Sequence, residues 1–146
     1  GKISVEDLKK NAIKRLRKEP DESIELDEVE EEENLLENCI ERGKQLMENL
    51  HTLAEKHECI GEVRGKGLFC GAELVSNRET REPAEESKVA AVVKDCMGQG
   101  VIIGATNRSF PGFNNTLCLS PALICTAEDI DLITEAVDQA LTRVFG

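Results

Sequence analysis

Two segments, residues 60–75 and 104–124, constrain the fold of this 146-residue chain more than any other feature. Each contains short apolar runs that are entered through glycine-containing turns or a polar loop. Glycine permits tight turns, and short apolar runs bounded by turn residues are typical of strands. The sequence therefore predicts strands at residues 60–64, 68–75, 101–105 and 116–120.

Apolar residues recur at helical spacing in three other stretches, which predicts helices over residues 35–57, 84–97 and 126–145. The first is the longest and carries Leu35, Leu36, Cys39, Ile40, Gly43, Leu46, Met47, Leu50, Leu53 and Ala54 on its apolar positions. Thr126 precedes the last helix, and Asp129 follows three residues later, as in a capping box. Three amphipathic helices of this kind need a common apolar partner, and the predicted strands supply it.

The first 33 residues differ in character from the rest. Ser4 is positioned to cap a helix that Pro20 ends. Ile24 and Leu26 alternate with polar residues, which predicts a strand over residues 23–29. Residues 21–33 contain nine acids and no base. Such a run is typical of a solvated edge strand or linker, and the alternative is a docking site for a basic partner.

The predicted order of elements is α-β-α-β-β-α-β-β-α. That order indicates an α/β (α+β) two-layer sandwich, with helices on one face of a mostly antiparallel sheet. Residues 24–105 would form a β-α-β-β-α-β unit, which matches the ferredoxin-like split motif. We expect one compact domain, with residues 1–33 as a helix and acidic strand that cap residues 34–146.

Composition argues against several classes of function. The net charge of −11 argues against binding nucleic acid or anionic membranes, because both need a basic surface. No apolar run approaches the ~20 residues that span a bilayer, and no signal core opens the chain, so we expect a cytoplasmic protein. The six cysteines fall mostly on apolar faces without a CxxC pair, which favours free thiols. Neither His51 nor His57 lies near ligand-spaced cysteines, so no metal site is expected.

The glycines around Lys66 do not form a phosphate loop. Cys70 stands where a dinucleotide fingerprint would place its third glycine, and the segment lies between two strands. A lysine at the tip of a hairpin is solvated, so Lys66 is not expected to act as a nucleophilic amine.

The strings VRGKGL at residues 63–68 and TNRSFPGFNN at residues 106–115, followed by SPAL, together resemble the C-terminal small domain of class III (omega) aminotransferases. These enzymes use pyridoxal 5'-phosphate. Ser120 stands where many members have a proline, a variant that agrees with the taurine–pyruvate branch. The matching positions that the resemblance makes structural are Val63, Arg64, Gly65, Gly67, Leu68, Asn114 and Pro121.

The resemblance also implies a binding residue and a missing partner. Arg108 matches a loop arginine that binds the acidic group of the substrate and swings away when that group is absent. The cofactor lysine belongs to a large domain that this chain cannot contain. We therefore expect no cofactor bound by this chain alone, no catalysis by it alone, and a large cofactor domain as its partner in the parent enzyme. A homodimer is the other assembly to consider.

The resemblance covers residues 34–145 and not residues 1–33. This break leads to the hypothesis of a chimera or de novo designed cap joined to an aminotransferase small domain. Two alternatives stay open at this point. One is a structural scaffold without activity, and the other is a ferredoxin-like module that binds a small molecule.

Overall fold

The computed structural model describes residue 4, residues 22–106 and residues 114–146. Its elements, in chain order, are α2 (Glu22–Lys56), β1 (Ile60–Lys66), β2 (Phe69–Asn77), β3 (Glu82–Pro83), α3 (Glu86–Gly98), β4 (Gly104–Thr106), β5 (Thr116–Leu119) and α4 (Ala127–Phe145). No described helix is both long enough and apolar enough to cross a membrane.

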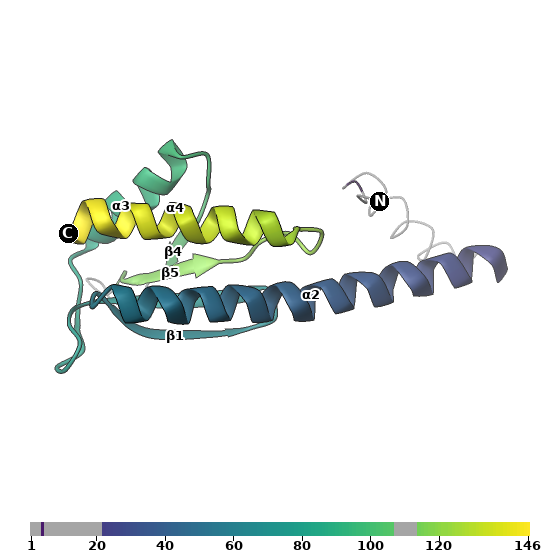
Figure 1. Cartoon of the computed structure of the whole chain (residues 1–146), viewed down its shortest axis with the longest axis horizontal. Helices are drawn as coiled ribbons and strands as arrows, with labels where there is room; N and C mark the ends of the chain where they lie inside the picture. The colour runs from purple at the N-terminus through teal and green to yellow at the C-terminus, as the bar shows by residue number, and fades with distance from the viewer. Residues whose placement is uncertain (1–3, 5–21, 107–113) are drawn as a thin grey trace.

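The strands form one open sheet in the order β1-β2-β5-β4, and β3 pairs with the end of β2. Every pairing is antiparallel. The helices form a second layer (Figure 1): α2 packs against β1 and β2, α3 against β4 and β5, and α4 against both α2 and α3. The predicted two-layer α/β sandwich with an antiparallel sheet is confirmed.

Aliphatic residues fill the space between the two layers. Leu46 and Leu50 of α2 are fully buried, as are Val89 and Val92 of α3. Helical spacing brings each of these pairs to one face, and that face meets the inward side of the sheet. The core therefore lies between the helix layer and one face only of the sheet.

The N-terminus of α4 forms as the sequence predicted. The Thr126 side chain accepts a hydrogen bond from the Asp129 N–H, and the Asp129 carboxylate accepts one from the Thr126 N–H. This capping box satisfies two backbone donors that an uncapped helix leaves unpaired. It fixes the first turn of α4, so that Ile130 and Val137 are both fully buried.

The strand predicted over residues 23–29 is wrong, because these residues belong to helix α2. The prediction relied on Ile24 and Leu26 alone. Glutamate and leucine favour helix, and acidic residues near a helix N-terminus stabilise it through the helix dipole. No glycine or proline stands between Pro20 and Gly43 to stop the helix. Without that first strand, the described residues do not form the predicted ferredoxin-like unit.

Two other features of the sheet differ from the prediction. The strand predicted at residues 101–105 is β4, which begins only at Gly104. The polar stretch after β2 contains a short extra strand, β3, at Glu82–Pro83. The helix predicted over residues 35–57 begins much earlier, at Glu22, and the helix expected between Ser4 and Pro20 lies outside the described residues apart from residue 4. The remaining predicted elements are present within a few residues of their predicted ends.

Candidate functional site

The face of the sheet opposite the helices carries Arg64, one of the positions that the sequence singled out, together with several small residues. Successive strand residues point to opposite faces. On β2, Cys70, Ala72 and Leu74 are buried under the helices, so Phe69 and Glu73 lie on the other face. We call this second face the open face, because no described helix covers it.

Strand register places small residues across the centre of the open face. Gly71 of β2 lies opposite Arg64 on β1 and opposite Cys118 on β5, and Cys118 lies opposite Gly104 on β4. We call Gly71, Cys118 and Gly104 the small-residue row. Of these three residues only Cys118 has a side chain, and Arg64 of β1 stands at the end of the same line of the register.

Charged and hydroxyl side chains lie beside the small-residue row. The Arg64 guanidinium donates to Glu62 Oε2 at 3.0 Å and lies 3.5 Å from Glu73 Oε2. Glu73 lies opposite Thr116, which is 4% exposed and whose Oγ1 has no hydrogen-bond partner among the described residues. The sequence alone left the partner of Arg64 unnamed, and the structure supplies two carboxylates.

The glycine hairpin is held against α2 by close backbone contact. Gly67 has φ +57°, a conformation that favours glycine. A Cβ on Gly65 would lie 2.7 Å from Cys70 Sγ. Leu68 is buried and Val63 is half-buried. The geometry around this motif is that of a tightly packed turn, and Lys66 in this turn is exposed.

The second motif is anchored at the C-terminal end of its loop. Asn115 is 4% exposed, and its side-chain Nδ2 donates to Leu74 O at 2.9 Å. The backbone carbonyl of Asn115 accepts a hydrogen bond from the Leu74 N–H. The Asn114 N–H donates to Glu86 Oε1 at 3.3 Å. Pro121 is half-buried just beyond β5. Arg108 lies outside the described residues.

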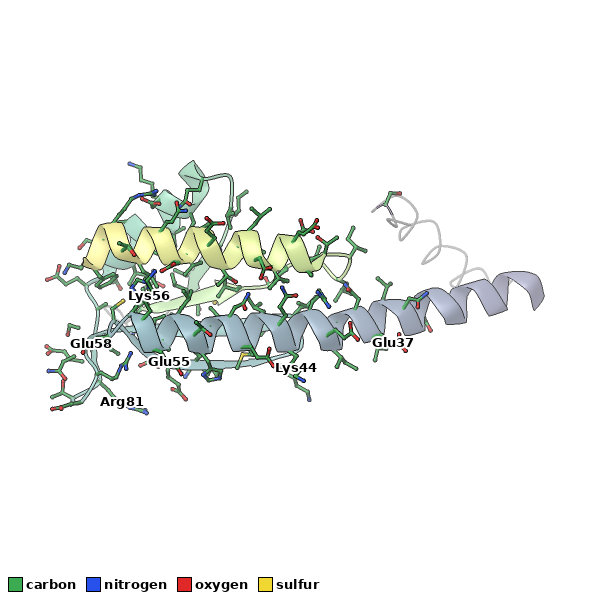
Figure 2. All side chains as sticks on the ribbon, viewed as in Figure 1. Glu37, Lys44, Glu55, Lys56, Glu58 and Arg81 are labelled. Carbon is green, nitrogen blue, oxygen red and sulfur yellow. The ribbon has the colours of Figure 1, made fainter. Side chains whose placement is uncertain are left out.

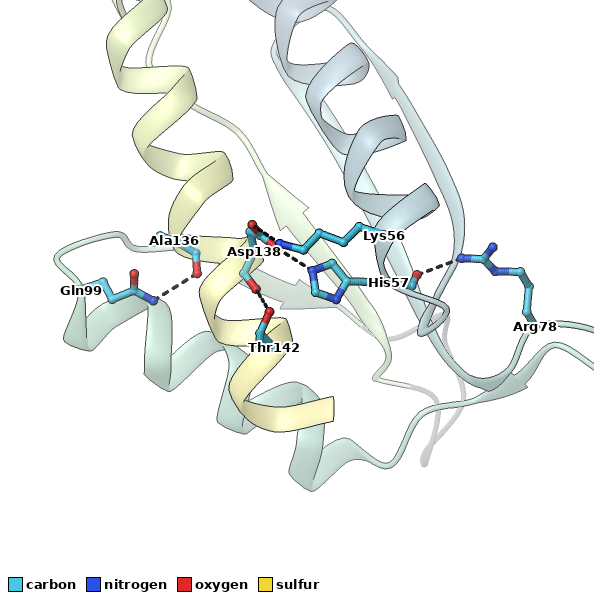
Figure 3. A network of polar contacts seen from close by, with 7 residues as sticks. All are labelled: Lys56, His57, Arg78, Gln99, Ala136, Asp138 and Thr142. Atoms are coloured by element: carbon cyan, nitrogen blue, oxygen red, sulfur yellow. Dashed lines mark hydrogen bonds and ion pairs between the residues drawn. The ribbon is translucent and has the colours of Figure 1, made fainter. Parts of the chain in front are cut away.

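A cleft of about 820 Å³ lies where the C-terminal ends of α2 and α4 approach the end of β2. Its lining includes His57, Cys59, Arg78, Lys88 and Phe145. The Arg78 guanidinium donates to Ala54 O and His57 O, so it caps the end of α2 (Figure 3). The Lys88 Nζ lies 5.3 Å from the centre of the Phe145 ring. The cations in this cleft therefore already have partners.

A partly buried polar network stands beside this cleft (Figure 3). Asp138 of α4 accepts from Lys56 Nζ at 2.8 Å on both oxygens, and His57 Nε2 lies 2.6 Å from Asp138 Oδ1. Burial raises the pKa of Asp138, but the hydrogen bonds from Lys56 and His57 outweigh it and lower the pKa below 3.8. Sequence reasoning missed this pair, because 81 residues separate His57 from Asp138 and no motif links them.

Cys59 and Cys96 are not activated nucleophiles. All six cysteines are free, as the sequence predicted. Burial raises the pKa of Cys59 and of Cys96 to about 11, which keeps both as thiols at neutral pH. No group of three or more His, Cys, Asp or Glu among the described residues could hold a metal ion.

The described lysines do not fit an aldehyde cofactor. A lysine that holds one needs a desolvating or cationic setting. Lys44, Lys56, Lys66, Lys88 and Lys94 are all exposed (Figure 2 labels Lys44 and Lys56). The described residues thus provide no covalent anchor for pyridoxal 5'-phosphate.

Comparison with known proteins explains why the described residues contain no anchor for the cofactor. The chain is 63% identical over 127 residues to the hypotaurine/taurine–pyruvate aminotransferase of Paracoccus denitrificans, and the match covers 87% of this chain but 28% of that protein. It is 53% identical to the taurine–pyruvate aminotransferase of Bilophila wadsworthia, over 80% of this chain and 26% of that protein. The chain therefore spans about a quarter of the length of the curated relatives that it matches.

Solved structures of aminotransferases also match this chain over only part of their own length. A Bacillus anthracis aminotransferase superposes with a TM-score of 0.75 at 38% identity, over 80% of this chain and 26% of that chain. A Pseudomonas amine transaminase, solved in its PLP-bound form, superposes with a TM-score of 0.69 at 31% identity, over 80% of this chain and 25% of that one.

The aminotransferase class-III family profile matches residues 23–141. The sequence alone placed the N-terminal boundary of the resemblance at Asn34. The family match starts before that residue, and α2 runs through Asn34 without a break. With a family match over most of its length and relatives above 50% identity, the chain belongs to the class-III aminotransferases.

Proposed function

We propose that this chain is the small-domain segment of an aminotransferase that moves an amino group from an aminosulfonate or omega-amino acid to an oxo acid such as pyruvate. The observation that carries the proposal is the 63% identity to the hypotaurine/taurine–pyruvate aminotransferase of Paracoccus denitrificans. Pyridoxal 5'-phosphate, when bound in the rest of such an enzyme, supplies the carbonyl group that accepts and passes on the amino group. The described residues supply no anchor for it, and the segment would not be catalytic alone.

The contribution of this segment would be recognition of the acidic end of the substrate. Arg108 lies in the loop between β4 and β5, whose two ends are fixed by the pairing of Thr106 with Thr116. A guanidinium binds sulfonate or carboxylate through a planar fork of N–H donors. A loop carried by a rigid sheet can present such a group to a substrate and withdraw it.

A hybrid enzyme tests this proposal. Residues 22–146 of this chain replace the matching quarter of the Paracoccus denitrificans relative, and alanine formation from pyruvate is measured. The donors are taurine, β-alanine and an uncharged primary amine. We expect Arg108→Leu to lower kcat/KM for the two acidic donors by about tenfold to a hundredfold, the usual effect of losing a hydrogen bond to a charged group. The uncharged amine should be affected little.

Lys44→Leu is the matched control, because it removes an exposed cation from α2, which packs against β1 and β2. It should leave all three donors unchanged. An equal loss for acidic and uncharged donors in Arg108→Leu would refute the role in substrate recognition.

A further inference from the structure

Asn115 is a buried polar side chain at the point where the β4–β5 loop enters the sheet. It is 4% exposed and stands directly before β5. Buried amides almost always have a hydrogen-bond partner, and here Nδ2 donates to Leu74 O at 2.9 Å. The Leu74 N–H donates in return to the backbone carbonyl of Asn115 at 2.7 Å. Asn115 therefore extends the pairing of β5 with β2 beyond the register pair of Glu73 and Thr116.

The amide of Asn115 is not needed to satisfy the backbone of β2. Leu74 O also accepts from the Ala84 N–H at 3.0 Å, so this carbonyl keeps a donor without Asn115. An apolar side chain could fill the same space without the cost of desolvating an amide. What the amide adds is a link from the start of β5 to β2 and to the segment that leads into α3. This link fixes where β5 begins relative to the rest of the sheet.

The β4 side of the same loop depends on β5. β4 is a three-residue strand with every residue exposed, and it pairs with β5 at the edge of the described sheet. Its pair nearest the loop is Thr106 with Thr116, the residue next to Asn115. On the β5 side, the Asn114 N–H donates to Glu86 Oε1 at 3.3 Å. The positions of both loop ends are therefore set where Asn115 holds β5.

We propose that Asn115 is a positioning residue for substrate recognition, because its amide sets the place from which the β4–β5 loop presents Arg108 to the acidic group of the substrate. Asn115 acts without touching the substrate, since its side chain is buried and bonded to Leu74 O. The inference rests on the proposed function, because it takes Arg108 as the recognising residue. It goes beyond that function in assigning part of the donor selectivity to a residue that acts only by position.

The first test measures donor selectivity in the hybrid enzyme with taurine, β-alanine and the uncharged primary amine. We expect Asn115→Ala to lower kcat/KM for the two acidic donors by about tenfold, because small displacements of a binding group are costly. The loss should appear in KM, since binding made equally in the ground and transition states does not alter kcat. The uncharged amine should be affected little. Equal losses for all three donors, or no loss, would overturn the proposal.

Gln99→Ala is the matched control, because the Gln99 amide also donates to a backbone carbonyl, Ala136 O at 3.1 Å, but in the helix layer (Figure 3). It should leave the selectivity among the three donors unchanged. Asn115→Ser is the second variant, and it should show the same selective loss if Asn115→Ala does not fold. A selective loss in Gln99→Ala as large as in the Asn115 variants would contradict the positioning role.

The second test does not depend on activity. Trypsin cleaves after arginine, so the rate of cleavage after Arg108 in the chain alone reports how firmly the loop is held. Mass mapping compares it with cleavage after Arg64 in β1. We expect Asn115→Ala to raise the ratio of the two rates severalfold, because one lost hydrogen bond eases local opening by that order. An unchanged ratio would overturn the proposal, and Gln99→Ala should leave the ratio unchanged.

The two proposals can fail separately. If Arg108→Leu weakens acidic and uncharged donors equally while Asn115→Ala raises cleavage after Arg108, the recognition role of Arg108 is refuted and the anchoring of the loop by Asn115 stands. If Arg108→Leu is selective for acidic donors and Asn115→Ala is not, the proposed function stands and the positioning role is refuted.

Discussion

Gly43 decides how closely α2 can approach the sheet. A Cβ at this position would lie 2.6 Å from the carbonyl carbon of Gly67 and 2.9 Å from its Cα. Both neighbours are backbone atoms of the hairpin, so no flexible side chain can move aside. Cys39, one turn earlier, also faces Gly67, at 3.1 Å from where a Cβ of Gly67 would stand. At this contact the helix and the hairpin meet through backbone atoms.

We predict that Gly43→Ala lowers the free energy of unfolding by about 1–3 kcal/mol, the usual cost of forcing an extra group into a packed site. Urea unfolding followed by circular dichroism measures it. Gly98→Ala is the control, because Gly98 ends α3 without a positive φ, and a Cβ there would meet nothing within 4 Å. Alanine favours helix, so this variant should be neutral or more stable. Equal effects of the two substitutions would show that the backbone contact is wrong.

At the scale of elements, a seam of polar side chains joins α2 to α4. Gln45 and Asn49 donate to Asp131 Oδ1, at 3.0 and 3.1 Å, and the seam ends in the network of Lys56, His57 and Asp138. The two helices run in the same direction, because later residues of α2 meet later residues of α4. Hydrogen bonds of this kind fix the register of one helix against the other, which apolar packing alone leaves less defined.

Asp138→Asn tests this seam through its pH dependence. The pKa of Asp138 is lowered in the folded state, so its carboxylate stabilises the fold above its ordinary pKa of 3.8, and this stabilisation is lost as pH falls through the lower folded-state value. Wild type should therefore exceed Asp138→Asn in stability most at neutral pH, and the difference should shrink below about pH 4. Urea unfolding from about pH 3 to pH 7 measures it. Glu55→Gln, at an exposed position of α2, is the control and should differ little from wild type at neutral pH. A constant difference at all pH values for Asp138→Asn would contradict the assignment.

At the scale of the whole molecule, the segment has a core of its own but an incomplete site. Its helices bury one face of the sheet, and its described lysines are exposed. We predict that the chain alone, treated with pyridoxal 5'-phosphate and then borohydride, gives only scattered labelling of surface lysines. Absorption spectra and mass mapping of the modified lysines provide the measurement. A single stoichiometric adduct at one protected lysine would mean that the chain has a cofactor site of its own.

The sequence alone determined the elements whose signals are local. The helix of residues 126–145 followed from its apolar spacing and from Thr126 and Asp129, which act within one turn. The hairpin followed from Gly65 and Gly67. The family followed from two short motifs, whose spacing along the chain is visible without any structure. The strand over residues 23–29 failed because two apolar residues cannot outweigh a run of good helix formers.

Only the tertiary structure decided which residues meet across long stretches of chain. His57 and Asp138 are paired across 81 residues, and the small-residue row joins Gly71 to Cys118 and Gly104 through strand register. Each of these contacts depends on how the layers pack, and packing depends on the sum of many weak apolar contacts that no local pattern contains. The sequence by itself therefore determined the helices, the hairpin and the family of this protein. The packing of its layers decided the polar seam and the open face, because those places are made of residues that are neighbours only in space.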